Sequence, residues 1–209
     1  MNTKALPRAP KQVRSLATRQ KLLGATADVL VTLGYAGTTT TEVALRAGVS
    51  QGALYKHFGS KHQLLASTTA HLFERLIDRF RHAFAQSRVD GDRLGRALRE
   101  LWAVFIMPEL YAVLELYIAA RTDESLRQAL VPVLIQHRAN LHVEARLLFP
   151  RAAEQHPRFE QSIDGILATM QGAAMSAAVL PEMVDDQSIA EYLERLCRRE
   201  LEPYVEAVL

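Results

Sequence analysis

Residues 34–61 read GYAGTTTTEVALRAGVSQGALYKHFGSK, and this stretch decides the fold. Residues 39–42 (TTTE) match the capping box, in which a threonine caps a helix start and a glutamate three residues later returns the bond. The helix that begins there meets Gly48, whose missing side chain suits a tight turn between two crossing helices. Ser50 then caps a third helix over residues 51–57. The pattern predicts a helix-turn-helix.

Longer helices flank this motif on both sides. Apolar residues recur at helical spacing from Thr18 to Leu33, and Gly34 supplies a left-handed stop. Residues 60–63 (SKHQ) form a second capping box and open a helix with apolar spacing as far as Phe80. The rest of the chain reads as further helices and shows no convincing strand. Breaks are expected near 89–92, at 107–108, around 121–124, at 149–157 and near 181–186, and Pro132 marks a kink or a division between two helices.

The charges divide the chain into a basic and an acidic part. Residues 1–62 hold nine lysines and arginines against two acidic residues, a net charge of +7, which leaves −5 for the remainder because the whole chain carries +2. Every lysine lies at or before Lys61. A basic segment attracts phosphate, whereas an acidic one is repelled by it. A disordered basic tail is the alternative, but four of these charges fall inside the helical motif: Lys21, Arg46, Lys56 and Lys61.

Composition excludes several other classes of protein. The 209 residues are 49% hydrophobic, enough to bury a substantial core. Cys197 is the single cysteine, so no internal disulfide forms and a reducing, cytoplasmic setting fits best. No apolar run approaches the roughly 20 residues that span a bilayer, and no apolar segment of a secretory signal follows the N-terminal basic residues. We expect a soluble protein that binds no cofactor.

These motifs resemble the DNA-binding domain of TetR-family regulators over about residues 18–65. The matching runs are 34–39 (GYAGTT), 42–44 (EVA), 47–50 (AGVS), 52–55 (GALY), 57–58 (HF) and 60–61 (SK). The resemblance implies an all-α protein, with an N-terminal three-helix DNA-binding domain followed by a larger helical ligand-binding and dimerisation domain. Leu45 and Arg46 occupy positions that are often charged in the family. We expect a flexible basic arm over 1–15, a helix-turn-helix domain over 16–60 and a regulatory domain over 61–209.

The third helix is expected to enter the major groove of double-stranded DNA. Gln51 and Lys56 can contact base edges there, and Gly52 permits close backbone approach. Arg46 reaches a phosphate or a base edge, or stays in water. Further donors at helix edges suit phosphate oxygens: Thr39, Thr40, Ser50, Tyr55, His57 and Lys61. The alternatives are that Thr39 and Ser50 serve only as caps and that Tyr55 belongs partly to the core.

The C-terminal part is expected to contain a dimer interface, indicated by small side chains, and a ligand pocket, indicated by large ones. Small residues over 159–180 suit close helix packing, and the expected homodimer interface is Ile166, Met170, Ala173, Ala177, Ile189, Tyr192 and Leu196. Large or adaptable side chains are expected to line a ligand pocket: Trp102, Phe105, Met107, Tyr111, Tyr117, Met170 and Met175, with Glu115 orienting the ligand. An ordinary intramolecular core is the alternative for both sets.

The expected function is therefore a repressor that a small, largely apolar ligand releases from a palindromic operator by shifting the spacing of the two heads. Control by a protein partner is an alternative, which an exposed apolar patch outside the dimer face would favour. Control by a metal, through His137, His142 and Glu144, is a weaker one, because histidines five apart lie on different helix faces. An enzyme is not expected, since no phosphate loop, nucleophile elbow or zinc-protease helix is present.

Overall fold

Every regular element is helical in the computed structural model, which describes residues 11–87, 92–180 and 186–204. The elements are α1 (Lys11–Gly37), α2 (Thr40–Ala47), α3 (Gln51–His57), α4 (Lys61–Gln86), α5 (Arg93–Phe105), α6 (Pro108–Ala119), α7 (Glu124–Leu148), α8 (Pro150–Gln155), α9 (Phe159–Val179) and α10 (Asp186–Leu201), followed by a 3-10 turn at Glu202–Tyr204. The predicted all-α fold is confirmed.

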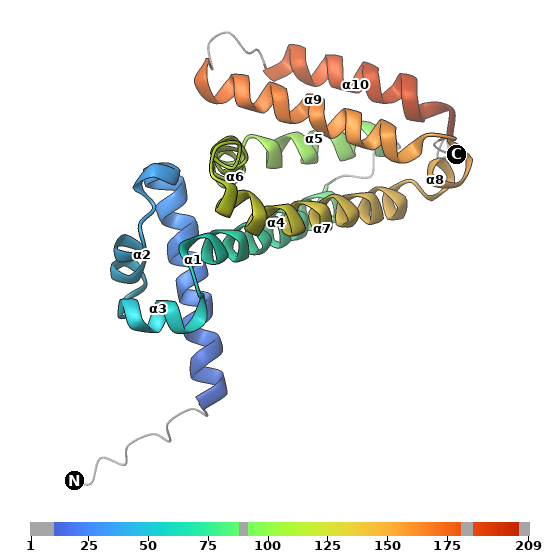
Figure 1. Cartoon of the computed structure of the whole chain (residues 1–209). Helices are drawn as coiled ribbons and strands as arrows, with labels where there is room; N and C mark the ends of the chain where they lie inside the picture. The colour runs from blue at the N-terminus through green and yellow to red at the C-terminus, as the bar shows by residue number, and fades with distance from the viewer. Residues whose placement is uncertain (1–10, 88–91, 181–185, 205–209) are drawn as a thin grey trace, which may run out of the picture.

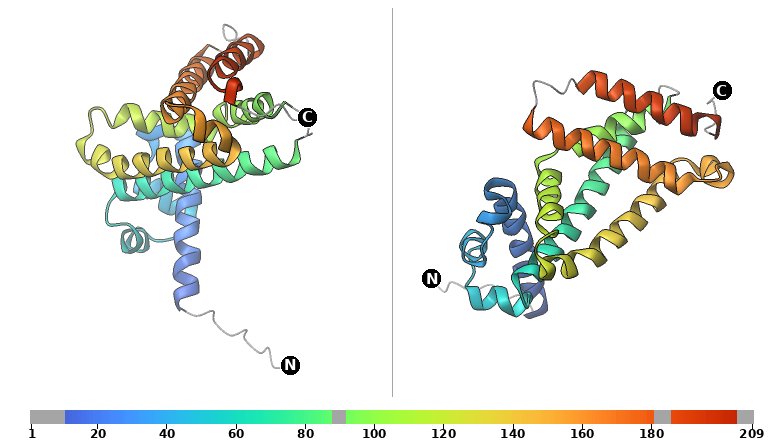
Figure 2. Two further views of the ribbon diagram at one scale, coloured as in Figure 1. Left: turned by 90° about the vertical axis from the view of Figure 1, so that its right-hand side faces the viewer. Right: turned by 45° about the horizontal axis from the view of Figure 1, so that its top comes forward.

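The helices form a small head and a larger regulatory domain. Helices α1, α2 and α3 make the head, and α4 leads from it into the regulatory domain (Figure 1). Helices α9 and α10 lie side by side as an antiparallel pair, across the domain from α4 and α7 (Figures 1 and 2). Helix α5 packs against both α4 and α10, so it fills the space between these two layers.

Local signals in the sequence shape the head. The Thr39 side chain accepts a hydrogen bond from the Glu42 backbone N–H at 3.1 Å, and Gly48 adopts a left-handed conformation with φ 65°. The Ser50 side chain accepts from the Ala53 N–H at 3.2 Å. The turn therefore follows the sequence pattern. The apolar core of the head consists of Leu22, Leu23, Ala25, Val29, Val43, Ala44, Leu54, Phe58 and Leu64.

A second apolar cluster joins the head to the regulatory domain. Leu30 of α1 packs there with Leu65 of α4, Leu116 of α6, and Leu126 and Leu130 of α7, and each of these side chains is at most 1% exposed. Because a close-packed core transmits displacements between its members, the head is held rigidly against α6 and α7. We call this the seam cluster.

Four details differ from the sequence-based expectations. Helix α1 begins at Lys11, so residues 11–15 of the expected arm are helical, while residues 1–10 lie outside the described ranges. Helix α7 continues through Pro132 rather than dividing there. Helix α8 occupies the expected break at 149–157, because six residues between two prolines are too few to show a period. Leu64 also belongs to the head core, which therefore extends past residue 60.

Removing the centre of the seam cluster should destabilise the whole protein. Leu116 is fully buried, so Leu116→Ala is expected to lower the free energy of unfolding by about 2–5 kcal/mol through lost burial and the remaining cavity. Leu45 is 74% exposed on α2, and Leu45→Ala should change the same quantity by only about 0.5 kcal/mol. Urea unfolding at one protein concentration, followed by circular dichroism, measures both. Equal losses would contradict the assigned role of the seam cluster.

Candidate DNA-binding surface and ligand cavity

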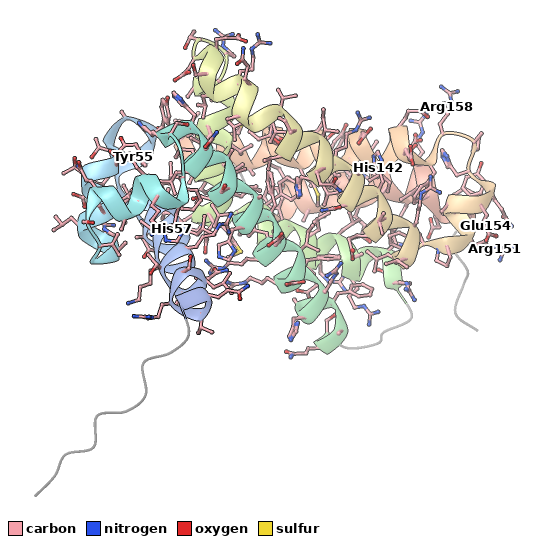
Figure 3. The ribbon with its side chains drawn as sticks, turned by 60° about the horizontal axis from the view of Figure 1, so that its bottom comes forward. Tyr55, His57, His142, Arg151, Glu154 and Arg158 are labelled. Carbon is pink, nitrogen blue, oxygen red and sulfur yellow. The ribbon has the colours of Figure 1, made fainter. Side chains whose placement is uncertain are left out.

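Helix α3 presents a polar face to solvent. Leu54 is fully buried in the head core, which turns the opposite face of this short helix outward. Gln51, Gly52, Tyr55 and Lys56 are all exposed on that face, as the sequence pattern predicts. Figure 3 shows Tyr55 and His57 on α3 at the end of the molecule away from α8. The face carries amide, hydroxyl and ammonium groups, the types that contact base edges and phosphates.

Side-chain hydrogen bonds tie this face to the first turn of α2. The Gln51 amide nitrogen donates to the Thr41 hydroxyl at 2.5 Å. The hydroxyls of Tyr55 and Thr40 lie 3.4 Å apart, within reach of a weak hydrogen bond. These contacts bring Thr40, Gln51 and Tyr55 together on one surface. Thr39 and Ser50 act as caps, so their hydroxyls already accept a backbone hydrogen bond each.

Three other predicted DNA-binding residues are engaged within the chain. Arg46 donates to the Thr32 hydroxyl of α1 at 2.9 Å and to the Glu42 carboxylate at 3.2 Å. The Lys61 ammonium lies 4.6 Å from the centre of the Tyr35 ring, and burial lowers its pKa. His57 is half-buried beside Phe58. Sequence patterns do not reveal these intramolecular contacts. The outward face of α3 is therefore the principal candidate for the DNA-binding surface.

Glu115 lies at the junction between head and regulatory domain, not in a ligand pocket as predicted. Helix α1 breaks at Gly34, which has φ 67°, and the freed Tyr35 backbone N–H donates to the Glu115 carboxylate at 2.8 Å. A Cβ atom at Gly34 would lie 2.9 Å from both carboxylate oxygens. The left-handed backbone conformation therefore favours glycine, and a side chain here would also displace the Glu115 carboxylate.

A second carboxylate completes this junction. Asp123 accepts a hydrogen bond from the Tyr35 hydroxyl at 2.8 Å and lies 3.2 Å from the His62 imidazole Nε2. Its other oxygen caps α7 by accepting from the Leu126 N–H at 2.8 Å. That backbone bond, with the Tyr35 and His62 contacts, lowers the pKa of Asp123. Burial and the hydrogen bond to Asp123 raise the pKa of Tyr35 to about 12. Helices α1, α4 and α7 thus meet at one side chain.

An apolar cavity of about 130 Å³ lies inside the regulatory domain. Helices α4, α5, α6, α7, α9 and α10 all contribute to its wall. The wall is apolar except for His137, Glu144 and the Cys197 thiol, whose pKa burial raises to about 12. Cys197 therefore stays a neutral thiol. An apolar cavity of roughly 150 Å³ is large enough to bind benzene, so this one suits a ligand of one ring.

The predicted pocket residues are mostly elsewhere. Phe105 lines the cavity, whereas Trp102 and Met170 pack in the core around it and Tyr111 against that core. The others do not line the cavity: Met107 and Tyr117 pack against the apolar cluster that includes Phe73, Phe80 and Leu110, and Met175 is partly exposed on α9. The sequence shows that these side chains are large, but the face each one occupies depends on packing between distant helices.

The predicted dimer residues also separate into two groups. Ile166 and Met170 are buried in the chain's own core, so they cannot form a surface contact, which corrects that prediction. Ala173, Ala177, Ile189 and Leu196 are half-buried, and Tyr192 is exposed. The exposed small residues of α9 include Gly165, Ala168 and Gly172, which the sequence analysis did not select for the interface. Their spacing of three and four residues places them on one helix face.

The metal alternative finds no support in the geometry. The imidazole of His137 stacks on Phe73 with ring centres 3.5 Å apart, while the Nε2 of His142 lies 2.8 Å from Asp164 of α9 (His142 is labelled in Figure 3). Within residues 11–87, 92–180 and 186–204, no three His, Cys, Asp or Glu side chains are arranged to hold a metal ion. In the same ranges, no single helix is long and apolar enough to cross a membrane.

The arrangement of a helix-turn-helix head on a cavity-containing helical domain defines a DNA-binding regulator. Residues 22–68 match the family model of bacterial regulatory proteins, tetR family. A Mycobacterium tuberculosis HTH-type transcriptional regulator is 35% identical over 176 residues, covering 82% of this chain and 88% of its own length. The Pseudomonas putida regulator CymR is 33% identical over 117 residues, 56% of this chain and 58% of CymR. The chain belongs to the TetR family, and the predicted resemblance is confirmed.

Solved structures share the fold. The crystal structure of a transcriptional regulator from Rhodococcus sp. RHA1 has a TM-score of 0.69 at 23% identity, covering 88% of this chain and 96% of that one. The multidrug binding protein EbrR, complexed with imidazole, has a TM-score of 0.59 at 20% identity, covering 90% of this chain and 96% of EbrR. At these identities the likeness extends to the fold.

The junction predicts a pH dependence of stability. Because the pKa of Asp123 is lowered in the folded state, its contribution is present above the ordinary carboxyl value of 3.8 and is lost as the pH falls through the folded pKa. Asp123→Asn keeps a good helix cap but removes the charge. We expect a lower melting temperature than wild type at pH 7, a difference that shrinks only below pH 3.8 and vanishes once the pH is below the folded pKa of Asp123. The exposed control Asp28→Asn on α1 should show no such difference, and a gap that persists in acid would contradict the assignment.

Proposed function

We propose that this chain is a homodimeric transcriptional repressor that binds a palindromic operator and is released from it by a small, largely apolar molecule. The observation that carries the proposal is the course of α4. Its residue Leu64 belongs to the head core, while Phe73, Leu76 and Phe80 further along the same helix line the cavity. One uninterrupted helix therefore touches both the DNA-reading unit and the candidate effector site.

The exposed face of α3 supports sequence-specific reading of DNA. Gln51 and Lys56 can reach base edges in the major groove, and the hydroxyls of Thr40 and Tyr55 suit phosphate oxygens. The basic head, with its net charge of +7 over residues 1–62, favours association with phosphate. One such head reads few base pairs, so useful specificity requires two heads on symmetric half-sites.

The α9–α10 pair supports a dimer. Gly165 and Gly172 have open space where a Cβ would lie, so packing within the chain does not require glycine at either position. Ala168 lies on the same exposed face, and Tyr192 of α10 is 53% exposed. A face of small residues lets another helix backbone approach closely. A second copy of the chain, packed as a four-helix bundle, would bury this surface.

Two mechanical connections support release by a ligand. Helix α4 has 26 residues and is about 39 Å long, and roughly 14–24 Å of it separate Leu64 in the head core from Phe73 and Phe80 in the cavity wall. Helix α6 places Leu110 in the cavity wall, while Glu115 and Leu116 hold the end of α1. A molecule that enlarges the cavity would push both helices and change the separation of the heads. Repression is the usual mode in the family.

Control by a protein partner is a second candidate, favoured by one observation. Helix α7 exposes Val131, Ile135, Val143 and Leu147, with Ile135 65% and Leu147 68% exposed. These residues are four or eight positions apart, so they follow a ridge that winds around α7, a helix outside the α9–α10 pair. Release of the purified regulator from DNA by a small molecule alone would show that no protein partner is required.

Selection of DNA fragments from the source genome tests the DNA-binding proposal. Wild-type protein should enrich one near-palindromic site, with affinity falling with salt at a slope of about −0.9 per neutralised phosphate. Gln51→Ala should change the preferred bases by about 1–3 kcal/mol of discrimination. Tyr55→Phe should weaken binding to every sequence by about threefold to tenfold. Uniform weakening in Gln51→Ala and altered base preference in Tyr55→Phe would reverse the assigned roles, and no enrichment at moderate salt would contradict the proposal.

The dimer has its own test in sedimentation velocity. Gly172→Leu fits the single chain, because nothing lies within 4 Å of the new Cβ, but it fills the approach of a partner helix. We expect dissociation to monomers with an intact circular dichroism spectrum, and with it the loss of high-affinity operator binding. Ala85→Leu makes a similar addition on an exposed position of α4, across the domain from α9, and should leave the dimer unchanged. A Gly172→Leu dimer as tight as wild type would exclude α9 from the interface.

A further inference from the structure

The cavity wall holds two ionisable side chains from a single helix face, besides the Cys197 thiol. His137 and Glu144 both come from α7 and stand about two helical turns apart. The remaining wall is apolar and includes the rings of Phe73, Phe80, Phe105 and Phe149. The chemistry of these two side chains therefore decides which polar group a ligand can carry into the cavity.

Glu144 is already paired and does not call for a cationic ligand. Arg81 of α4 donates through Nε to one carboxylate oxygen at 2.9 Å and through Nη2 to the other at 2.5 Å. This two-pronged pair satisfies the carboxylate charge and joins α4 to α7 at the cavity. A bound cation would have to compete with the Arg81 guanidinium, so an uncharged ligand is favoured.

His137 is the polar group left without a partner. Its ring stacks flat on Phe73, with 3.5 Å between ring centres and an interplanar angle of 1°. Its Nδ1 is shielded from solvent and has no hydrogen-bond partner among the residues that the structure describes. Burial lowers the pKa of His137 to about 4, so the ring is neutral at pH 7. A buried polar atom without a partner is costly, and a ligand can supply the missing bond.

We infer that the cavity binds an uncharged molecule of one aromatic ring with a single hydroxyl, a phenol in its simplest form, whose hydroxyl pairs with His137 Nδ1. A hydroxyl can donate or accept, so it matches either tautomer of the imidazole. The volume of about 130 Å³ admits one ring rather than two. The phenylalanine rings of the wall favour an aromatic guest. This inference rests on the proposed ligand site and specifies its chemistry.

Calorimetric titration with phenol and toluene tests the inference directly on the full-length protein. His137→Phe keeps the ring and the stack on Phe73 but removes both nitrogens. Phenol should bind this variant about tenfold more weakly than it binds wild type, because its hydroxyl is buried without a partner, while toluene should bind both about equally. The control His82→Phe replaces an exposed histidine of α4 and should leave both affinities unchanged.

Several results would overturn the inference. They are failure of phenol to bind wild type, unchanged phenol affinity in His137→Phe, or equal losses for phenol and toluene. If the variant does not fold, nitrogen NMR of the wild-type histidines decides, with His137 assigned through its contact with the Phe73 ring. Its Nδ1 signal should move with phenol and not with toluene, and a signal that stays still refutes the contact. A protein that still selects genomic DNA but binds no phenol keeps the proposed regulatory role and loses only this ligand class.

Discussion

The break in α1 at Gly34 is the constraint on which the rest of the arrangement depends. A break inside a helix leaves the carbonyl groups before it and the backbone N–H groups after it without intrahelical partners, and other groups must supply the missing hydrogen bonds. Glu115 of α6 satisfies one of these groups, and the seam cluster around Leu116 closes over the same place. The direction of the head relative to the regulatory domain is therefore set by one carboxylate and a few leucines. Asp123 fixes the same point from α7.

The regulatory domain combines rigidity at this junction with empty space at its centre. A cavity in a core costs free energy, roughly in proportion to its volume, because the side chains around it lack contacts. Here the empty space borders α4 and α6, which both pack against α1. A guest that fills it would recover those contacts and act on the helices that hold the head. The cavity thus lies where a bound molecule can act on the helices that hold the head.

The sequence predicted the head well because its signals are local. The Thr39 and Ser50 caps and the left-handed Gly48 each depend on residues three or four positions away, and all three appear in the structure as expected. Contacts between distant segments were not visible. Glu115 was expected beside a ligand but caps α1, and Ile166 was expected at a dimer surface but is buried. Helical periodicity identifies which residues share a face, while tertiary packing decides what that face meets.

The seam cluster also bears on how such regulators diversify. Residue 60 looks like a natural cutting point, yet the head core includes Leu64 from the next helix, and Leu30 of the head packs with residues of α6 and α7. A head transplanted onto a foreign effector domain would bring an unmatched surface to its new neighbour. Recombination that combines a new head with a new regulatory domain must therefore carry all residues of the seam cluster together. Otherwise the residues on the two sides of the cluster must change in step.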